Sequence, residues 1–420
     1  MTSAEIVAVI SRRDLNTIET PPKASISDVA QLSSYNWIEA PTPTIVVPGS
    51  PSLWNPPPPR RLPKDTGLIY IAQNAGRHPD SPLEPLFRAL YVSDPSFDIR
   101  STDIVSDRNN IRKLLSFVNP GSSRNGREDF TINLEVVENT VIFCRAETKT
   151  HEFIAPHEFR GYGHEFEKAY TTDKIQDSTG HHRIISYRFG GLNLIIRHET
   201  DGYIGEKVAP SNGLSEGKVI PSDDLASGKV VPSDGDSLSS AVTSLSLSDG
   251  SSTPPGPGPK LDVEKRGQEI PLESTLEIKT RVHYKPIPFA DVATQLWVSQ
   301  TPNLVRAYHH NGVFKTPEVE DVTAEIKKWE NHNQAHLRKL AGLISNILGV
   351  MKESGRSGNA TCVLVYDASR DRLVVWKVDK RKMLPEDLYS KWARTGDCRE
   401  AAVASSETKD QPAVQSPAQE

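Results

Sequence analysis

The sequence predicts an α/β fold in which helices flank one mixed central β-sheet. Three observations predict it: alternating apolar positions mark several strands, apolar positions three and four apart mark several helices, and the two patterns are interleaved along the chain. The 420 residues include 32 prolines and only 36% hydrophobic residues, with a mean hydropathy of -0.47. This composition predicts one core together with unpacked segments.

The predicted organisation has five segments: a mostly disordered proline-rich arm (1–66), the first part of the core (67–203), a disordered low-complexity insert (204–270), the second part of the core (271–396) and a disordered tail (397–420). Pro, Ser and Thr dominate the arm, which favours extended chain over helix. Trp37 and Trp54 indicate that part of this arm lies against the core.

The first part of the core alternates helices and hairpins. Apolar spacing predicts helices at 81–92, 107–118 and 161–171, a pair of strands at 129–147 turning at Glu138–Asn139, and a hairpin at 183–201 turning at Gly190–Gly191. In the insert, the similar stretches "EKVAPS", "GKVIPS" and "GKVVPS" recur every 11 residues, at Lys207, Lys218 and Lys229. This repeat is too short and too polar for a solenoid, so we expect disorder.

The second part of the core begins and ends with strands. The patterns predict strands at 274–282, 304–308, 361–367 and 372–378, a helix at 289–299, and a strongly amphipathic helical stretch at 319–350.

Charge, cysteines and hydropathy restrict the function classes. The net charge is -5, but residues 204–270 hold ten acids and six bases and the tail holds five acids and two bases, so the remainder carries +2, which permits a nucleic-acid partner. The three cysteines, Cys144, Cys362 and Cys398, lack Cys-x-x-Cys spacing, which favours a reducing compartment, nuclear or cytoplasmic. The apolar stretch Ile6–Ile10 is too short for a signal peptide, and we expect no membrane association.

Carboxylates gather on two predicted strands. Side chains two apart on a strand share a face, so Glu277 and Lys279 in "LEIKT" point one way, as do Glu199 and Asp201 in "RHETD". If the strands are neighbours, the crowded carboxylates repel one another unless divalent cations neutralise them, and oxygen ligands favour Mg²⁺ or Mn²⁺. Glu167 in "GHEFE" adds a carboxylate, and Lys279 is suited to stabilise charge on a phosphate.

The simpler alternative is a solvated surface. An isolated Glu-x-Lys pair on a strand is most often an exposed cross-strand pair. "RGYGH" and "FGGL" lack the third glycine of a dinucleotide-binding loop. The pairs His181–His182 and His309–His310 lack metal-ligand spacing, and we interpret them as surface or turn residues.

Taken in order, these motifs resemble the DXO family of decapping exoribonucleases, within the wider PD-(D/E)XK nuclease fold. The matching positions are Arg108 before the "KLL" helix, Gly163 and Glu167 in "GHEFE", Glu199 and Asp201 in "ETD", Glu277 and Lys279 in "EIK", and Gln295 in the helix that precedes a Pro-Asn turn. The resemblance covers about residues 67–203 and 271–380. His164 and Thr200 depart from it, since the family usually has apolar residues there.

The resemblance implies a role for each matching residue. Glu167, Asp201 and Glu277 would bind one or two divalent cations, Mg²⁺ or Mn²⁺, assisted by the carbonyl of Ile278 and, through water, by Glu199. Lys279 and Gln295 would flank the attacking water, and Arg108 would hold a phosphate near the RNA 5′ end.

Three functions remain open at this point. The resemblance implies a metal-dependent hydrolase in mRNA quality control, which removes an incomplete or nonstandard cap or a pyrophosphate from capped or 5′-triphosphate RNA and degrades the body 5′ to 3′. It also implies an exonuclease or another RNA-processing protein as partner. The alternatives are a nuclease of the same fold that acts on DNA and a non-catalytic binding or scaffold protein.

Overall fold

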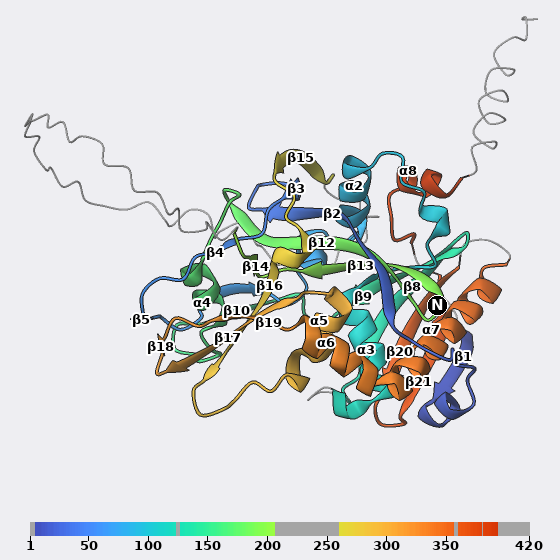
Figure 1. Cartoon of the computed structure of the whole chain (residues 1–420). Coiled ribbons are helices and arrows are strands. Elements are labelled where there is room, and N and C mark those ends of the chain that lie inside the picture. The colour runs from blue at the N-terminus through green and yellow to red at the C-terminus, as the bar shows by residue number, and fades with distance from the viewer. Residues whose placement is uncertain (1–4, 123–126, 206–259, 357–359, 380, 394–420) are drawn as a thin grey trace, which may run out of the picture. The chain divides into compact units, whose positions relative to one another are not determined.

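The computed structural model describes residues 5–122, 127–205, 260–356, 360–379 and 381–393 (Figure 1). It confirms the predicted α/β fold with a mixed β-sheet flanked by helices. The disorder predicted for most of the insert (206–259) and for the tail (397–420) lies outside the described residues. Within the described residues, no helix is both long enough and apolar enough to cross a membrane.

The larger sheet has eleven strands. Their order across the sheet is β1 (Glu5–Ser11), β21 (Arg372–Lys377), β20 (Thr361–Asp367), β8 (Phe130–Val137), β9 (Thr140–Ala146), β7 (Ile104–Asp107), β13 (Leu192–Glu199), β12 (Ser178–Phe189), β2 (Ile26–Ile38), β3 (Thr44–Gly49) and β15 (Asp262–Gly267). At its centre, β7 runs parallel to both β9 and β13. The carboxyl ends of β7 and β13 therefore lie at the same edge of the sheet.

A second sheet has eight strands. It contains β11 (Thr171–Thr172), β4 (Leu53–Trp54), β14 (Gly202–Tyr203), β16 (Thr275–Val282), β17 (Asn303–His310), β18 (Val313–Phe314) and β5 (Arg60–Arg61) in that order, with β19 (Val319–Asp321) paired to β17. Two further strands, β6 (Gly67–Tyr70) and β10 (His151–Ile154), form a ribbon of their own. The single predicted sheet is thus joined by a second one.

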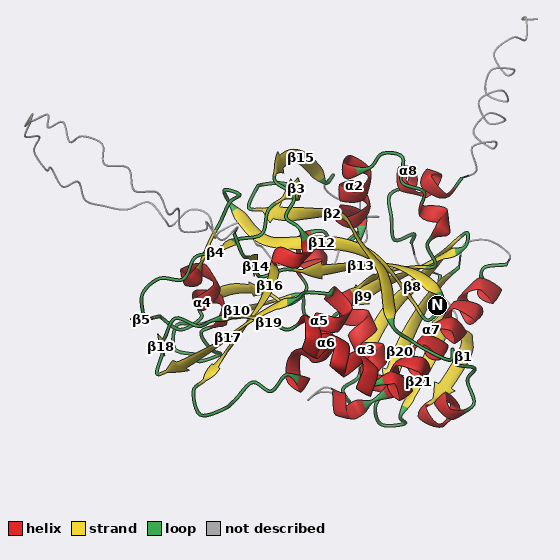
Figure 2. Cartoon of the chain, viewed as in Figure 1, coloured by secondary structure: helices red, strands yellow, loops and turns green. Residues whose placement is uncertain are grey.

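Helices cover both faces of the larger sheet (Figure 2). One layer contains α3 (Arg108–Val118), α5 (Ala290–Ser299), α6 (Thr323–His332) and α7 (Gln334–Ser354), and the other contains α2 (Glu84–Ser93) and α8 (Glu386–Tyr389). Two short helices, α1 (Gln73–Arg77) and α4 (Gly163–Tyr170), lie near the second sheet and the ribbon, and short 3-10 turns occur at Arg12–Asn16, Ile99–Ser101, Pro120–Ser122, Leu272–Ser274 and Ser390–Trp392. Apolar burial on both faces, worth about 25 cal/mol per Å², stabilises this layering.

Both predicted hairpins are confirmed. Strands β8 and β9 pair antiparallel across Glu138–Asn139, and β12 and β13 pair across Gly190–Gly191. Gly190 and Gly191 have φ values of +60° and +88°, which only glycine adopts without strain. A Cβ at Gly190 would also lie 2.5 Å from the Cβ of Ala341 on α7, so the turn packs directly on that helix.

The predicted disordered arm is wrong for residues 5–66. These residues form β1 to β5, and β2 lies inside the larger sheet between β12 and β3. Trp37 on β2 is fully buried, and Trp54 on β4 packs near Tyr170, which confirms that both contact the core. The prolines fall mainly between the short strands. The overall proline content therefore predicted disorder, although the apolar residues between the prolines pair and pack as strands.

Two smaller predictions are also corrected. Residues 262–267, assigned to the disordered insert, form β15, which pairs parallel to β3. The stretch 319–350, predicted as helical throughout, begins with β19 and then forms two helices, α6 and α7, separated at Asn333. The side-chain amide of Asn333 donates to the carbonyl of Trp329 at the end of α6, an alternative to helix continuation that asparagine favours.

Candidate active site

The predicted site residues come from five segments that meet beside β16. Arg108 is the first residue of α3, Glu167 lies on α4, Gln295 lies on α5, Glu199 ends β13, and Glu277, Ile278 and Lys279 lie on β16. The strand predicted to continue to Asp201 ends at Glu199, and Asp201 lies in the link to β14. Strands β13 and β16 are not neighbours, because β13 belongs to the larger sheet and β16 pairs with β14 and β17 in the second sheet.

Glu277 is the centre of the polar contacts. Its side chain is 2% exposed, while Leu276 and Ile278 pack in the apolar cluster under α4, as the alternation on this strand predicted. Its Oε1 accepts hydrogen bonds from Lys279 Nζ and Gln295 Nε2. Burial opposes ionisation, but Lys279 and then Arg108 lower the pKa of Glu277 to about 2.

Arg108 reaches the other oxygen of this carboxylate. Its Nη1 lies 3.3 Å from Glu277 Oε2, and its side chain is 14% exposed. Arg108 also lines the adjoining pocket. Glu277 thus fixes one lysine, one arginine and one amide around a single carboxylate.

Asp201 is tied to β16 through the backbone. The amide of Ile278 donates to Asp201 Oδ2 at 2.7 Å, and Lys279 Nζ donates to the Ile278 carbonyl at 3.2 Å. Burial, followed by repulsion from Glu277, raises the pKa of Asp201 to about 7. The two segments that carry the predicted carboxylates therefore meet, although their strands do not pair.

Glu167 lies close enough to the other carboxylates to be repelled by their negative charges. Burial raises the pKa of Glu167 well above its usual range, and repulsion from Asp201 and then Glu199 adds to this effect. Four carboxylates from α4, β13, the link to β14 and β16 therefore lie within electrostatic reach of one another. Such crowding is what divalent cations relieve.

The donor set fits a hard divalent cation in its chemistry, because it consists of carboxylates and one backbone carbonyl. In the described ranges, however, no three His, Cys, Asp or Glu side chains are arranged closely enough to hold one ion. Both oxygens of Glu277 instead accept hydrogen bonds from Lys279, Gln295 and Arg108, so metal binding requires these contacts to give way.

A polar pocket of about 250 Å³ adjoins the carboxylates. Besides Arg108, Asn109 and Glu199, it is lined by Tyr70, Ile71, Ala72, Gln73, Asn74, Ala75, Pro82, Asp107, Arg112, Arg145, His182, Arg197 and His198. Arg112 forms no ion pair with any described residue, and its buried Nε has no hydrogen-bond partner there. Burial, with repulsion from Arg108 and Arg145, lowers the pKa of Arg112 to about 10.

Arg108 was predicted from the sequence, but Arg112 and Arg145 were not. Arg108 and Arg112 are four residues apart in the first turns of α3, which places both on one face at the positive end of the helix dipole. Arg145 lies near the end of β9, lines the same pocket and shares Glu147 with Lys113. The Arg-x-x-x-Arg spacing at a helix start was the available signal, and it indicates an anion site.

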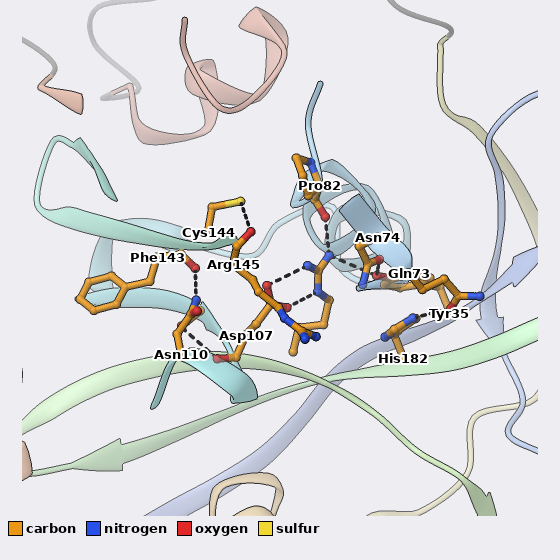
Figure 3. Close-up of polar contacts among 12 residues, drawn as sticks. Tyr35, Gln73, Asn74, Pro82, Asp107, Asn110, Phe143, Cys144, Arg145 and His182 are labelled. Carbon is orange, nitrogen blue, oxygen red and sulfur yellow. Dashed lines mark hydrogen bonds and ion pairs between the residues drawn. The ribbon is translucent and has the colours of Figure 1, made fainter. Parts of the chain in front are cut away.

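Two of the lining residues, Asp107 and Arg197, form a buried ion pair. Arg197 Nε and Nη2 donate to the two carboxylate oxygens of Asp107 at 2.7 and 3.1 Å, and Nη1 donates to the carbonyl of Pro82 and to the hydroxyl of Tyr35 (Figure 3). Arg197 is 2% exposed. Asp107 immediately precedes α3, so this pair fixes where Arg108 begins its helix.

The histidine pair at 181–182 is not on the surface, so that prediction is wrong. His181 and His182 are 4% and 5% exposed, because β12 lies between β13 and β2 and helices cover both faces. His181 Nδ1 contacts Asn36, and His182 Nε2 contacts Gln73 on α1. Burial holds the pKa of both histidines well below its usual range.

Solved structures share this fold. The structure of S. pombe Rai1 superposes with a TM-score of 0.51 over 89% of this chain and 99% of that chain, at 13% identity. Scheffersomyces stipitis Rai1, in complex with (3′-NADP)+ and a calcium ion, gives a TM-score of 0.54 over 93% and 98% of the two chains, at 11% identity. At such identities the likeness shows the fold alone.

Comparisons of the sequence itself give a family match. No curated protein matches this sequence. Residues 5–392, which include every predicted site residue, match the family described as Domain of unknown function (DUF8563). The chain therefore belongs to the DUF8563 family.

Proposed function

We propose that the protein is a metal-dependent phosphohydrolase that acts on RNA 5′ ends, by decapping or by removal of pyrophosphate. One observation carries the proposal: the buried Glu277, which binds Lys279, Gln295 and Arg108, lies among further carboxylates and beside an arginine-lined pocket. Phosphoryl chemistry requires carboxylates that bind cations next to guanidinium groups that bind phosphates.

The carboxylates would hold the cations. Glu167, Asp201 and Glu277 are the proposed ligands, with the carbonyl of Ile278 as a neutral ligand and Glu199 acting through water. A divalent cation bound there supplies Lewis-acid stabilisation of the charge on the phosphate. Ionisation of Asp201 is unfavourable without a counter-charge, since burial and Glu277 raise its pKa to about 7, and this favours cation binding near neutral pH.

Lys279 and Gln295 would position the attacking water. Both donate to the same oxygen of Glu277, so their donor groups lie on one side of this carboxylate. The ammonium of Lys279 stays charged, because attraction to Glu277 and Asp201 outweighs burial and raises its pKa. A fixed positive charge there stabilises negative charge as it grows on the phosphate.

The arginine-lined pocket would receive the phosphates of the 5′ end. Arg108 contacts Glu277 and lines the pocket, so it is suited to bind the scissile phosphate, while Arg112 and Arg145 would bind a phosphate farther out. The solved relatives support this choice of ligand class: S. pombe Rai1 has been crystallised with 3′-FADP and S. stipitis Rai1 with (3′-NADP)+.

The experiment that tests the proposal compares RNAs with different 5′ ends, and RNA with DNA. The full chain is incubated with Mg²⁺ or Mn²⁺ and single-stranded RNA bearing a 5′-triphosphate, an incomplete cap or a 5′-monophosphate, and with DNA of the same sequence. The proposal expects a shortened 5′ end on RNA. Equal turnover of DNA would support the DNA nuclease instead, because RNA selectivity requires 2′-hydroxyl contacts. No product with either metal would favour the non-catalytic scaffold.

A further inference from the structure

The β6–β10 ribbon and its flanking loops carry a concentration of exposed apolar side chains. In the described part of the chain, nine large hydrophobic side chains are exposed, and four of them belong here: Leu68, Ile71, Phe153 and Phe159. Phe153 is 68% exposed and Phe159 is 59% exposed. Exposed apolar groups that cluster in this way mark interaction surfaces.

The register places these side chains on one face. Leu68 lies directly opposite Phe153, and Tyr70 lies opposite His151 two residues along. Directly opposed residues share a face, and so do residues two apart on one strand. Leu68, Tyr70, His151 and Phe153 therefore form one apolar and aromatic face, which we call the ribbon face.

Positive charges are interleaved with the aromatic rings. The ammonium of Lys64 lies 5.4 Å from the ring centre of Phe159 at one end of the ribbon, and the guanidinium of Arg77 lies 5.0 Å from the ring centre of Tyr70 at the other. Lys149 and Arg160, both more than half exposed, pair with Glu152, whose side chain lies on the opposite face of β10 from Phe153. Surfaces that bind single-stranded nucleic acid typically have aromatic rings on which bases stack, beside cations that contact the phosphate backbone.

The ribbon face is continuous with the candidate active site. Tyr70, the last residue of β6, and Ile71 line the same pocket as Arg108 and Glu199. In Figure 1, β10 lies on the side of the molecule that also holds α4 and β16. Four strand residues span ~13 Å at ~3.3 Å per residue, which is room for roughly three to four stacked bases.

We propose that the ribbon face binds the single-stranded body of the RNA whose 5′ end occupies the arginine-lined pocket. This inference rests on the proposed function and adds to it a second contact region outside the catalytic residues. Bases stack on Phe153 and, beside the ribbon face, on Phe159, while Lys64 contacts the backbone. RNA long enough to leave the pocket is therefore held more tightly than a dinucleotide.

Binding of short and long RNA by the full chain tests the ribbon face. Fluorescence anisotropy in EDTA compares a 5′-phosphorylated 12-mer RNA with a 5′-phosphorylated dinucleotide. The double substitution Phe153→Ala and Phe159→Ala is expected to weaken binding of the 12-mer about tenfold or more, since stacking on each ring is lost, and to leave the dinucleotide unaffected. Phe153→Tyr keeps the ring and retains affinity, whereas Phe153→Leu keeps only apolar area and does not.

Ile6→Ala is the control, because Ile6 is exposed on β1, an edge strand of the larger sheet and not part of the ribbon, and it is expected to change neither affinity. Unchanged 12-mer binding by the double variant overturns the inference, as does full affinity in Phe153→Leu, which would show that stacking on the ring does not contribute. Hydrolysis of a 5′-triphosphate dinucleotide, which occupies only the pocket, separates the two proposals. If the wild type hydrolyses it but the double variant binds RNA normally, only the ribbon inference fails.

Discussion

The backbone amide of Ile278 on β16 donates a 2.7 Å hydrogen bond to Oδ2 of Asp201, in the link between β13 and β14. This contact joins the two parts of the core on either side of residues 206–259. It also brings Asp201 beside the carboxylate of Glu277, and burial together with repulsion from this carboxylate raises the pKa of Asp201. The candidate site therefore depends on two segments far apart in the sequence meeting at this bond.

Glu277→Gln is expected to destabilise the protein by roughly 2–3 kcal/mol and to abolish hydrolysis. The substitution leaves Arg108 and Lys279 without their buried counter-charge, and removing one partner of a buried pair is costly. The loss is greatest above about pH 4 and shrinks as the pH falls from 4 towards 2, because the lowered pKa of Glu277 stabilises the fold only while the group is ionised.

Urea unfolding at pH 7 and pH 3 measures this effect. Glu147→Gln is the control, since Glu147 is 22% exposed and pairs with Lys113 and Arg145. It should cost less, about 1 kcal/mol. Equal losses for both variants would show that Glu277 is not the electrostatic centre of the site.

Asp201→Asn is expected to stabilise the metal-free protein relative to wild type at pH 8. This gain in the free energy of unfolding should be smaller at pH 5. The raised pKa of Asp201 means that the folded state retains its proton better than the unfolded chain, whose pKa is about 4. The wild type therefore loses stability as the pH rises from about 4 to 7, and asparagine, which still accepts from Ile278, does not.

Thermal unfolding with and without Mn²⁺ extends this prediction. Mn²⁺ at about 100 times its Kd would add roughly 2.7 kcal/mol to the free energy of unfolding of the wild type at pH 8, and little to Asp201→Asn. If Mn²⁺ stabilised both proteins equally, the cation would bind elsewhere.

Arg112→Met is expected to stabilise the free protein by roughly 1 kcal/mol and to raise KM for 5′-triphosphate RNA with a smaller change in kcat. Arg112 has no ion pair among the described residues, and burial beside Arg108 and Arg145 disfavours its charge. Steady-state kinetics and urea unfolding are the measurements. Lys113→Met is the control, because Lys113 pairs with Glu147. A destabilised Arg112→Met variant with unchanged KM would argue against a phosphate role.

Arg197→Lys is expected to destabilise the protein by about 3 kcal/mol. Lysine cannot reproduce the paired hydrogen bonds to Asp107 together with those to Pro82 and Tyr35. Urea unfolding at pH 7 measures the loss. Wild-type stability in this variant would show that the buried pair does not fix the start of α3.

The strands and helices of the core were predictable because their patterns are local. The alternation around Gly190–Gly191 and the spacing in α3 are set by neighbours in sequence. The arm at residues 5–66 was not predictable in this way. Its first two strands, β1 and β2, pair with β21 and β12, from residues 372–377 and 178–189, and no local pattern reports such partners.

The candidate site likewise has one part that local sequence pattern predicts and one part that it does not. Glu277 and Lys279 could be assigned to one face of a strand from their spacing alone. The meeting of Asp201 with β16 depends on the short pairing of β14 at Gly202, a contact that spacing does not encode. Burial of His181 and His182 likewise follows from the position of β12 inside the sheet.

Release of pyrophosphate from 5′-triphosphate RNA tests the central claim most directly. The wild type is expected to release it with Mn²⁺ or Mg²⁺ and to stop when EDTA is added, while the double variant Asp201→Asn and Glu277→Gln, shown to be folded by circular dichroism, releases none. Equal release by the folded double variant, or none from any 5′ end by the wild type with either metal, would contradict the proposal that these carboxylates form a phosphohydrolase site.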